Sequence, residues 1–211
     1  MILLYIIFII LFIIACIIVV IAVPHAFSAL TSDRRMEYLE IAYVSPKIKP
    51  ELSGYTIAFI TDPHFIKEKK LRKIARRISR RNVDLLLLGG DFVNGPALDK
   101  DMRIIGEITT KDGIYGVDGN HDDHTELFAA MEKYGVKPLD NAGLIIKPHF
   151  YLAGEQDLWK RTPDVKKAVR KAEDDDFVLL LVHNHYFDMI QNMSRWDLML
   201  AGLTHGGQVT L

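Results

Sequence analysis

Cysteine is almost absent from this sequence, and neither sign of charge is in excess. Cys16 is the lone cysteine among 211 residues, so an intrachain disulfide and a metal site built from thiolates are both excluded. The 26 Lys plus Arg residues balance 27 Asp plus Glu residues, and the net charge of -1 excludes a generally basic nucleic-acid-binding protein. Composition alone therefore does not indicate the function, and the positions of apolar runs and polar clusters along the chain have to.

Charged residues are also missing from the first 23 positions. A helix over Met1–Val23 would rise about 1.5 Å per residue and could cross a hydrocarbon core of about 30 Å, so we predict a transmembrane helix. A cleaved signal peptide with Ala26–Ser28 as its cleavage site is the alternative. The run has no basic leader and exceeds the usual apolar segment of about 7–15 residues, which favours the anchor.

No basic residue precedes this run. The basic residues that follow it are Arg34, Arg35, Lys47 and Lys49. This asymmetry favours a single-pass membrane protein whose following domain is cytoplasmic.

The remainder divides into a connector, residues 24–50, and a domain, residues 51–211. The connector has mixed polarity, with a short strand expected around Ile41–Val44. In the domain, apolar runs alternate with helical patterns, which predicts an α/β fold. The helical patterns are Leu71, Ile74, Ala75 and Ile78, and then Leu127, Phe128 and Met131. The expected strands are Tyr55–Thr61, Val83–Gly89, Ile114–Val117, Phe150–Ala153, Phe177–Val182 and Leu198–Ala201.

The segment Lys67–Arg81 holds nine basic residues and one acid around an apolar stripe, so its outer face as a helix is strongly cationic. Two interpretations carry equal weight. The face is either an ordinary solvated surface or, near a bilayer, a surface drawn to anionic lipid headgroups.

Polar clusters stand where five of the apolar runs end. Because the carboxyl ends of strands line the ligand crevice in open α/β sheets, we expect these clusters to converge. Oxygen and imidazole ligands without cysteine suit divalent metals such as Mn, Fe, Zn, Co or Ni. The clusters are Asp62-Pro63-His64, Gly90-Asp91, Asp118-Gly119-Asn120-His121-Asp122, His183-Asn184-His185 and Gly202-Leu203-Thr204-His205.

Taken in order, these clusters resemble the five motifs of the calcineurin-like metallophosphoesterases, from about Ser53 to Leu211. The resemblance implies a four-layer α/β/β/α sandwich with two mixed sheets. The Gly-Gly-Gln ending of the last motif, with the apolar N-terminus, is most similar to a membrane-bound subgroup that includes UDP-2,3-diacylglucosamine pyrophosphatases.

Site roles follow from the resemblance, residue by residue. It implies two divalent metals that activate water for hydrolysis of a phosphoester or pyrophosphate bond. One metal would be held by Asp62, His64, Asp91 and His205, and the second by Asp91, Asn120 and His183, with Asp91 as the bridge. His121 is expected near the leaving-group oxygen, oriented by Asp122, and these two are the expected catalytic residues.

Two features depart from the family pattern. The last motif normally reads Gly-His-x-His, and Leu203 replaces the histidine that would complete the second metal site. His185 is a candidate substitute, although an ordinary loop histidine is the more common interpretation. The chain ends at Gln208–Leu211, where the family normally continues, so we expect a domain truncated at its C-terminus.

The resulting hypothesis is a membrane-tethered hydrolase of a phosphate-containing substrate, with a lipid-linked substrate favoured by the anchor and no nucleic acid expected. Two alternatives stay open, a non-catalytic metal-binding membrane protein and a nuclease. We assign no role to His124, and interpret Trp159 as a packing residue and Glu173–Asp176 as a solvated turn.

Overall fold

The computed structural model describes residues 5, 9–14, 16, 18–20, 23, 38–92, 95–186 and 195–205. The chain divides into two compact units, Met1–Tyr43 and Val44–Leu211. In the first unit, the described residues 9–14 and 18–20 are helical. Much of the predicted span Met1–Val23 and the C-terminal Gln208–Leu211 lie outside the described residues.

A helix able to cross a bilayer needs both length and apolar character. Within the described part of the chain, no helix has both.

The first sheet of the second unit has four strands in the order β1-β2-β3-β4, and every pair is parallel. Helices connect successive strands, as parallel pairing requires. A short 3-10 helix, η1 (Pro50–Leu52), precedes the first strand. The elements are β1 (Ile57–Ile60), α2 (Glu68–Arg81), β2 (Leu85–Leu88), α3 (Pro96–Gly106), β3 (Ile114–Gly116), α4 (His124–Lys133) and β4 (Lys137–Pro138).

The second sheet also has four strands, in the order β5-β6-β7-β8. Its first pair is antiparallel and the next two pairs are parallel. The elements are β5 (Ala142–Lys147), β6 (Phe150–Gly154), α5 (Val165–Ala168), β7 (Phe177–Val182) and β8 (Leu198–Ala201).

The alternation of side chains in β2 explains why the two sheets stack. All four leucines of this strand are completely buried. Leu85 and Leu87 point into a core that they share with the second sheet, including Phe150 and Leu179. Their neighbours in the strand point into the opposite core, beneath the helices. Because successive side chains of a strand face opposite sides, a continuous apolar run is required where both faces are covered.

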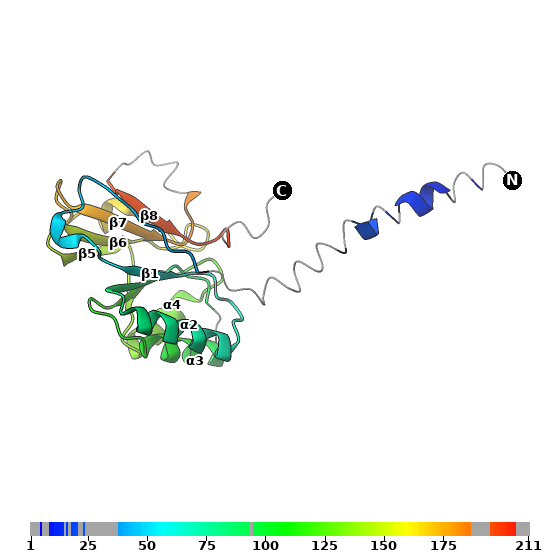
Figure 1. The fold of residues 1–211 in the computed structure, drawn as a ribbon, viewed down its shortest axis with the longest axis horizontal. Helices are drawn as coiled ribbons and strands as arrows, with labels where there is room; N and C mark the ends of the chain where they lie inside the picture. Colours follow the sequence, from blue (N-terminus) through cyan, green and yellow to red (C-terminus); the bar gives the residue numbers. More distant parts are fainter. Residues whose placement is uncertain are drawn as a thin grey trace. The chain divides into compact units, whose positions relative to one another are not determined.

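α2, α3 and α4 cover the outer face of the first sheet (Figure 1), and the short α5 packs on the outer face of the second, so the layers are helix, sheet, sheet and helix. On the first sheet, α2 buries Leu71, Ala75 and Ile78 and leaves its charged face to solvent. On the second sheet, α5 buries Val165 and Ala168 against the outer side. The α/β fold with two sheets is therefore as predicted.

Several details differ from the prediction. The first sheet is purely parallel in the described residues, whereas two mixed sheets were expected. No strand forms at Ile41–Val44, which is exposed coil. β5 was not predicted, because its sequence contains a glycine and it is only partly buried, so its apolar pattern is weak. α3 was also missed.

Candidate metal centre

The carboxyl ends of β1, β2, β3, β7 and β8 carry the five polar clusters, and the loops that follow these strands are bonded to one another. The backbone N–H of Asp62 donates to the carbonyl of Gly90 at 3.0 Å, and that of His64 to the carbonyl of Asp91 at 3.1 Å. Across the second sheet, the N–H of Gly202 donates to the carbonyl of His183 at 3.1 Å. Residues far apart in sequence are thus held at one end of both sheets.

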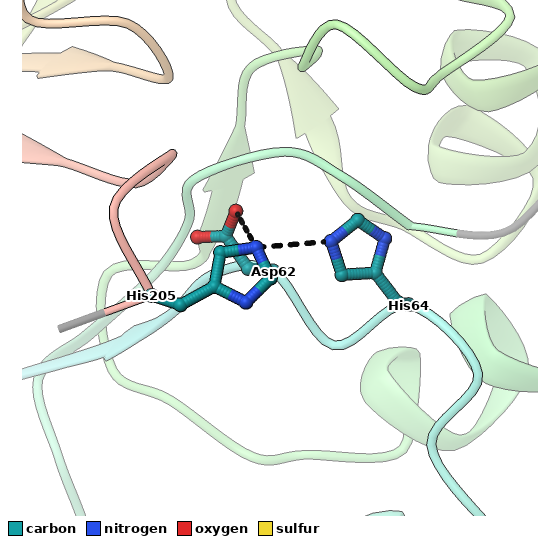
Figure 2. A group of neighbouring side chains, drawn as sticks. All are labelled: Asp62, His64 and His205. Carbon is teal, nitrogen blue, oxygen red and sulfur yellow. Dashed lines mark hydrogen bonds and ion pairs between the residues drawn. The ribbon is translucent and has the colours of Figure 1, made fainter. Parts of the chain in front are cut away.

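Asp62, His64 and His205 form the first group of side chains that could hold a metal ion (Figure 2). The Nε2 atoms of the two histidines lie 3.2 Å apart, and Nε2 of His205 lies 3.4 Å from Oδ1 of Asp62. Two imidazole nitrogens and a carboxylate facing a common point form a donor set suited to a borderline divalent ion.

Asp62, Asp91 and His183 form the second group, and it includes the fully buried His183. Nδ1 of His183 lies 2.8 Å from the carbonyl of Gly89, so a proton on Nδ1 satisfies that contact. Nε2 then presents a lone pair towards Oδ1 of Asn120 at 3.0 Å and Oδ2 of Asp91 at 3.4 Å. Two acceptor oxygens around this nitrogen call for either a proton on Nε2 or a metal cation that all three atoms share. The residues therefore fit a divalent metal.

Two carboxylates connect the groups. Asp62 belongs to both, and Oδ2 of Asp91 lies 3.7 Å from Nε2 of His64 as well as 3.4 Å from Nε2 of His183. The structure thus brings all six predicted ligands together. The bridging role predicted for Asp91 is compatible with its position, and Asp62 is a second candidate for it.

The backbone at the centre is strained. Asp62, His64, Asp91 and His205 have φ values of 52, 40, 59 and 50 degrees, in the left-handed region. Such conformations cost of order 1 kcal/mol or more for a residue other than glycine and persist where surrounding structure enforces them. Four of the six predicted ligands share this feature, so the fold directs these side chains at some cost in stability.

Electrostatics at the centre favour an anionic Asp91 opposite a cation. Burial alone would raise the pKa of Asp91, but contacts with His183 and the His121 backbone lower it. Burial alone would lower the pKa of His183, but Asp91 and the Gly89 carbonyl raise it to about 9. His183 of the metal-free protein thus carries a proton at neutral pH, which metal binding must release.

Of the two predicted catalytic residues, His121 lies at the protein surface, beside the metal-binding side chains. Its side chain is exposed, and its ring centroid lies 5.5 Å from that of His64, edge-on. Its backbone N–H donates to Oδ1 of Asp91 at 2.8 Å. The imidazole is therefore accessible to a substrate beside the first group.

Asp122 has contacts other than the predicted ones. Its Oδ2 accepts the backbone N–H groups of Asp91 and Gly119, both at 2.8 Å, and burial raises its pKa to about 7. These bonds tie the loop that carries Asn120 to the loop that carries Asp91. They indicate a positioning role in the ligand loops, and orientation of the His121 ring by Asp122 stays a prediction.

Leu203 and His185 bear on the second metal. The backbone N–H of Leu203 donates to Oδ1 of Asp62 at 3.2 Å, and its φ is 67 degrees. The ring of His185 packs on Tyr186, with 4.2 Å between centroids. Among the described residues, neither group at the centre includes His185.

Leu203→His is expected to raise the metal content towards two ions per chain and to increase hydrolysis most at low metal concentration. Histidine tolerates the left-handed backbone at this position, and it adds an imidazole where the family pattern has one. Metal analysis after dialysis, with activity measured against added Mn, tests this. If His185 already acts as the substitute, Leu203→His should add little and His185→Ala should empty the second site; no change from either variant contradicts our placement of that site.

A second polar network at the centre was not predicted from sequence. Asp118, completely buried, lies 3.0 Å from Nδ1 of His124 and accepts the backbone N–H of Asp157 at 3.2 Å. Asp157 is itself buried, and its Oδ1 accepts the N–H groups of Trp159 and Lys160. The network holds the loop after β6 against the loop after β3. The position of Asp157, three residues after the apolar strand β6, was the available signal.

The structure also tests the interpretations of Trp159 and of Glu173–Asp176. The side chain of Trp159 is 60% exposed, so it does not serve as the packing residue predicted. Glu173–Asp176 is a turn with three exposed residues, as predicted, although Asp176 is buried. Asp175, Asp176 and His149 form a third cluster at the opposite ends of β6 and β7.

Comparison with known proteins agrees with this geometry. The sequence profile of the calcineurin-like phosphoesterase family matches residues 55–205. "Phosphodiesterase YaeI" of Escherichia coli is 28% identical over 76% of this chain and 64% of its own length. An "Uncharacterized metallophosphoesterase" of Helicobacter pylori is 25% identical over 72% of this chain and 45% of its own length. The bovine "Transmembrane protein with metallophosphoesterase domain" is 24% identical over 77% of this chain and 43% of its own length.

This chain thus spans less than two thirds of these relatives. The profile match nevertheless covers all six predicted ligands and well over half of the sequence. The chain therefore belongs to the calcineurin-like phosphoesterase family, a family of hydrolases that act on phosphoester bonds.

Proposed function

We propose that this protein hydrolyses a phosphoester or pyrophosphate bond at a centre of two divalent metals. The observation that carries the proposal is the convergence of two metal-binding groups that share Asp62, with the buried His183 presenting its Nε2 towards Asp91 and Asn120. When bound, such a pair of metals polarises phosphoryl oxygens and lowers the pKa of water. Manganese is among the metals that suit this oxygen and imidazole donor set.

The residues of this chain bind the metals, position the ligand loops and donate a proton to the leaving group. Asp62, His64, Asp91 and His205 would hold one metal, and Asp91, Asn120 and His183 would hold the other. Asp122 keeps the two ligand loops together through its bonds to backbone N–H groups. His121, exposed beside His64, donates a proton or hydrogen bond to the leaving-group oxygen. The retention of an accessible histidine outside the ligand groups supports an enzyme over a protein that only binds metal.

His121→Ala is expected to lower hydrolysis of an aryl phosphodiester by about 10²–10⁴-fold, the usual contribution of a general acid, while the metal content stays that of the wild type. Purified protein is assayed with added Mn and again after chelation, which should abolish activity. His149→Ala, at the opposite end of the sheets, is the control for activity; its own metal content is measured separately because His149 belongs to the third cluster. Loss of metal in His121→Ala would show that this residue is a ligand.

The substrate class is the finer part of the proposal. We propose a lipid-linked substrate, for which a UDP-linked diacyl sugar is the specific case raised by the subgroup resemblance. Two observations support a membrane location: the uncharged stretch Met1–Val23 and the bovine relative, whose name describes a transmembrane protein. The basic residues after that stretch favour a cytoplasmic domain.

The anchor can be tested directly on the full-length protein. If Met1–Val23 stays in the mature protein as a spanning helix, the chain should remain in the membrane fraction after alkaline carbonate extraction. N-terminal sequencing of the recovered protein provides the control. A soluble product beginning near Ala29 would support signal cleavage instead.

A further inference from the structure

Exposed aromatic side chains occur in three of the loops that leave the strands at the end carrying the metal centre. In the described part of the second unit, the exposed large hydrophobic residues are Val44, Phe65, Ile145, Trp159 and Tyr186. The three aromatic ones follow β1, β6 and β7, and we call Phe65, Trp159 and Tyr186 the aromatic rim. Phe65 is 90% exposed, so the described residues leave this apolar ring almost uncovered.

The aromatic rim is attached closely to the centre. Phe65 directly follows the predicted ligand His64. The ring of Tyr186 packs on His185, two residues after His183. The backbone N–H of Trp159 donates to the buried Asp157 at 2.9 Å. Whatever binds the rim is therefore presented to the metal centre.

Exposed lysines accompany the rim. Lys67 and Lys69 follow Phe65 at the start of α2, and Lys160 follows Trp159. These three ammonium groups form no ion pair in the described part of the chain, since the nearby Glu68 is bonded to Arg72 at 2.8 Å. Cations are unfavourable at the N-terminus of a helix because of its dipole. The stability of α2 thus does not explain Lys67 and Lys69, and both are available to an anionic partner.

We propose that the aromatic rim and these three lysines form a surface that binds an anionic lipid bilayer. Aromatic rings prefer the interface between headgroups and acyl chains, and lysines beside them attract anionic headgroups. Single-stranded nucleic acid also combines stacking with phosphate contacts. The net charge of -1 and the uncharged stretch of 23 residues favour the bilayer.

The consequence concerns the substrate. A bilayer held by the aromatic rim brings phosphoester groups at headgroup depth to the open end of the metal centre. This consequence for the substrate rests on the proposed function. Membrane binding itself does not, because it requires no hydrolysis.

Trp159 can report binding in the full-length protein. The chain has two tryptophans, and the other, Trp196, packs on the outer core of the second sheet. In the variant Trp196→Phe, Trp159 is the only source of tryptophan emission. The protein is reconstituted with phosphatidylglycerol–phosphatidylcholine vesicles that carry either ordinary or brominated acyl chains. We expect brominated chains to quench Trp159, because an inserted indole contacts them; equal emission in both vesicles would overturn the proposal.

Charge variants in the same background locate the surface. Lys67→Glu with Lys69→Glu should reduce the quenching, with binding weakened about five-fold for each lysine removed. The matched control, Arg76→Glu with Arg80→Glu, makes the same charge change at exposed positions in the C-terminal half of α2. Equal losses in both variants would replace the proposed surface by general charge attraction. A response of Trp159 to an oligonucleotide, and not to vesicles, would assign the surface to nucleic acid.

The two proposals fail independently. Quenching is measured without substrate, so its absence leaves the hydrolase intact. Inactivity towards the aryl phosphodiester likewise leaves membrane binding standing.

Discussion

Replacement of Asp91 by asparagine is expected to lower metal content and hydrolysis together, and activity should fall by more than about 100-fold. Loss of an outer partner of a ligand already costs about 10–100-fold, and Asp91 would itself be a ligand. Its Oδ2 lies between His64 and His183, at 3.7 and 3.4 Å from their Nε2 atoms. Asparagine keeps the shape and removes the charge, so the effect measures the carboxylate. Metal per chain and turnover of an aryl phosphodiester are measured on the same preparation.

Asp101→Asn is the matched control. Asp101 is equally buried but lies in α3, away from the centre, so its neutralisation should leave the metal content unchanged. If Asp91→Asn kept both metals and lost activity alone, the residue would act on the substrate and the bridge would have to be assigned to Asp62.

Replacement of Gly202 by alanine is expected to be nearly as damaging, although it adds one methyl group. A Cβ at Gly202 would collide with Oγ1 of Thr61 and lie 2.8 Å from Oδ2 of Asp62 and 3.0 Å from Nδ1 of His183. Both groups at the centre include Asp62. Displacement of this carboxylate should therefore lower metal content and activity by about 100-fold, since misplacement by about 1 Å has effects of that size. Metal analysis and the diesterase assay measure both.

Gly135→Ala is the control for Gly202→Ala, because it adds the same methyl group at a glycine away from the centre. Gly135 has φ of 76 degrees and open space around it, so alanine there should cost about 1–2 kcal/mol of stability without loss of metal. The double variant Thr61→Ala with Gly202→Ala removes the worst collision and should recover part of the metal. Full activity in Gly202→Ala would mean that the last loop is placed differently from the structure described.

Much of the fold was predictable because burial imposes patterns on the sequence. The run of four leucines in β2 faces a core on each side, and a strand covered on both faces has to be apolar throughout. β7 is completely buried and was predicted with its observed bounds. The edge strand β5 was missed, because partial exposure relaxes its pattern. The parallel pairing of the first sheet depends on how helices connect its strands, which the strand sequences alone do not specify.

The sequence by itself determined which residues could ligate metals and where along the chain they occur, because each cluster directly follows an apolar run. Only the tertiary structure decided which of them meet. It set the 3.2 Å approach of His64 to His205, since these residues are 141 positions apart and are joined only through the stacking of two sheets. It also assigned Asp122 to the backbone of Asp91 and Gly119, and placed Trp159 at the surface. Such contacts depend on loop conformations that long-range packing imposes, and local sequence patterns do not encode that packing.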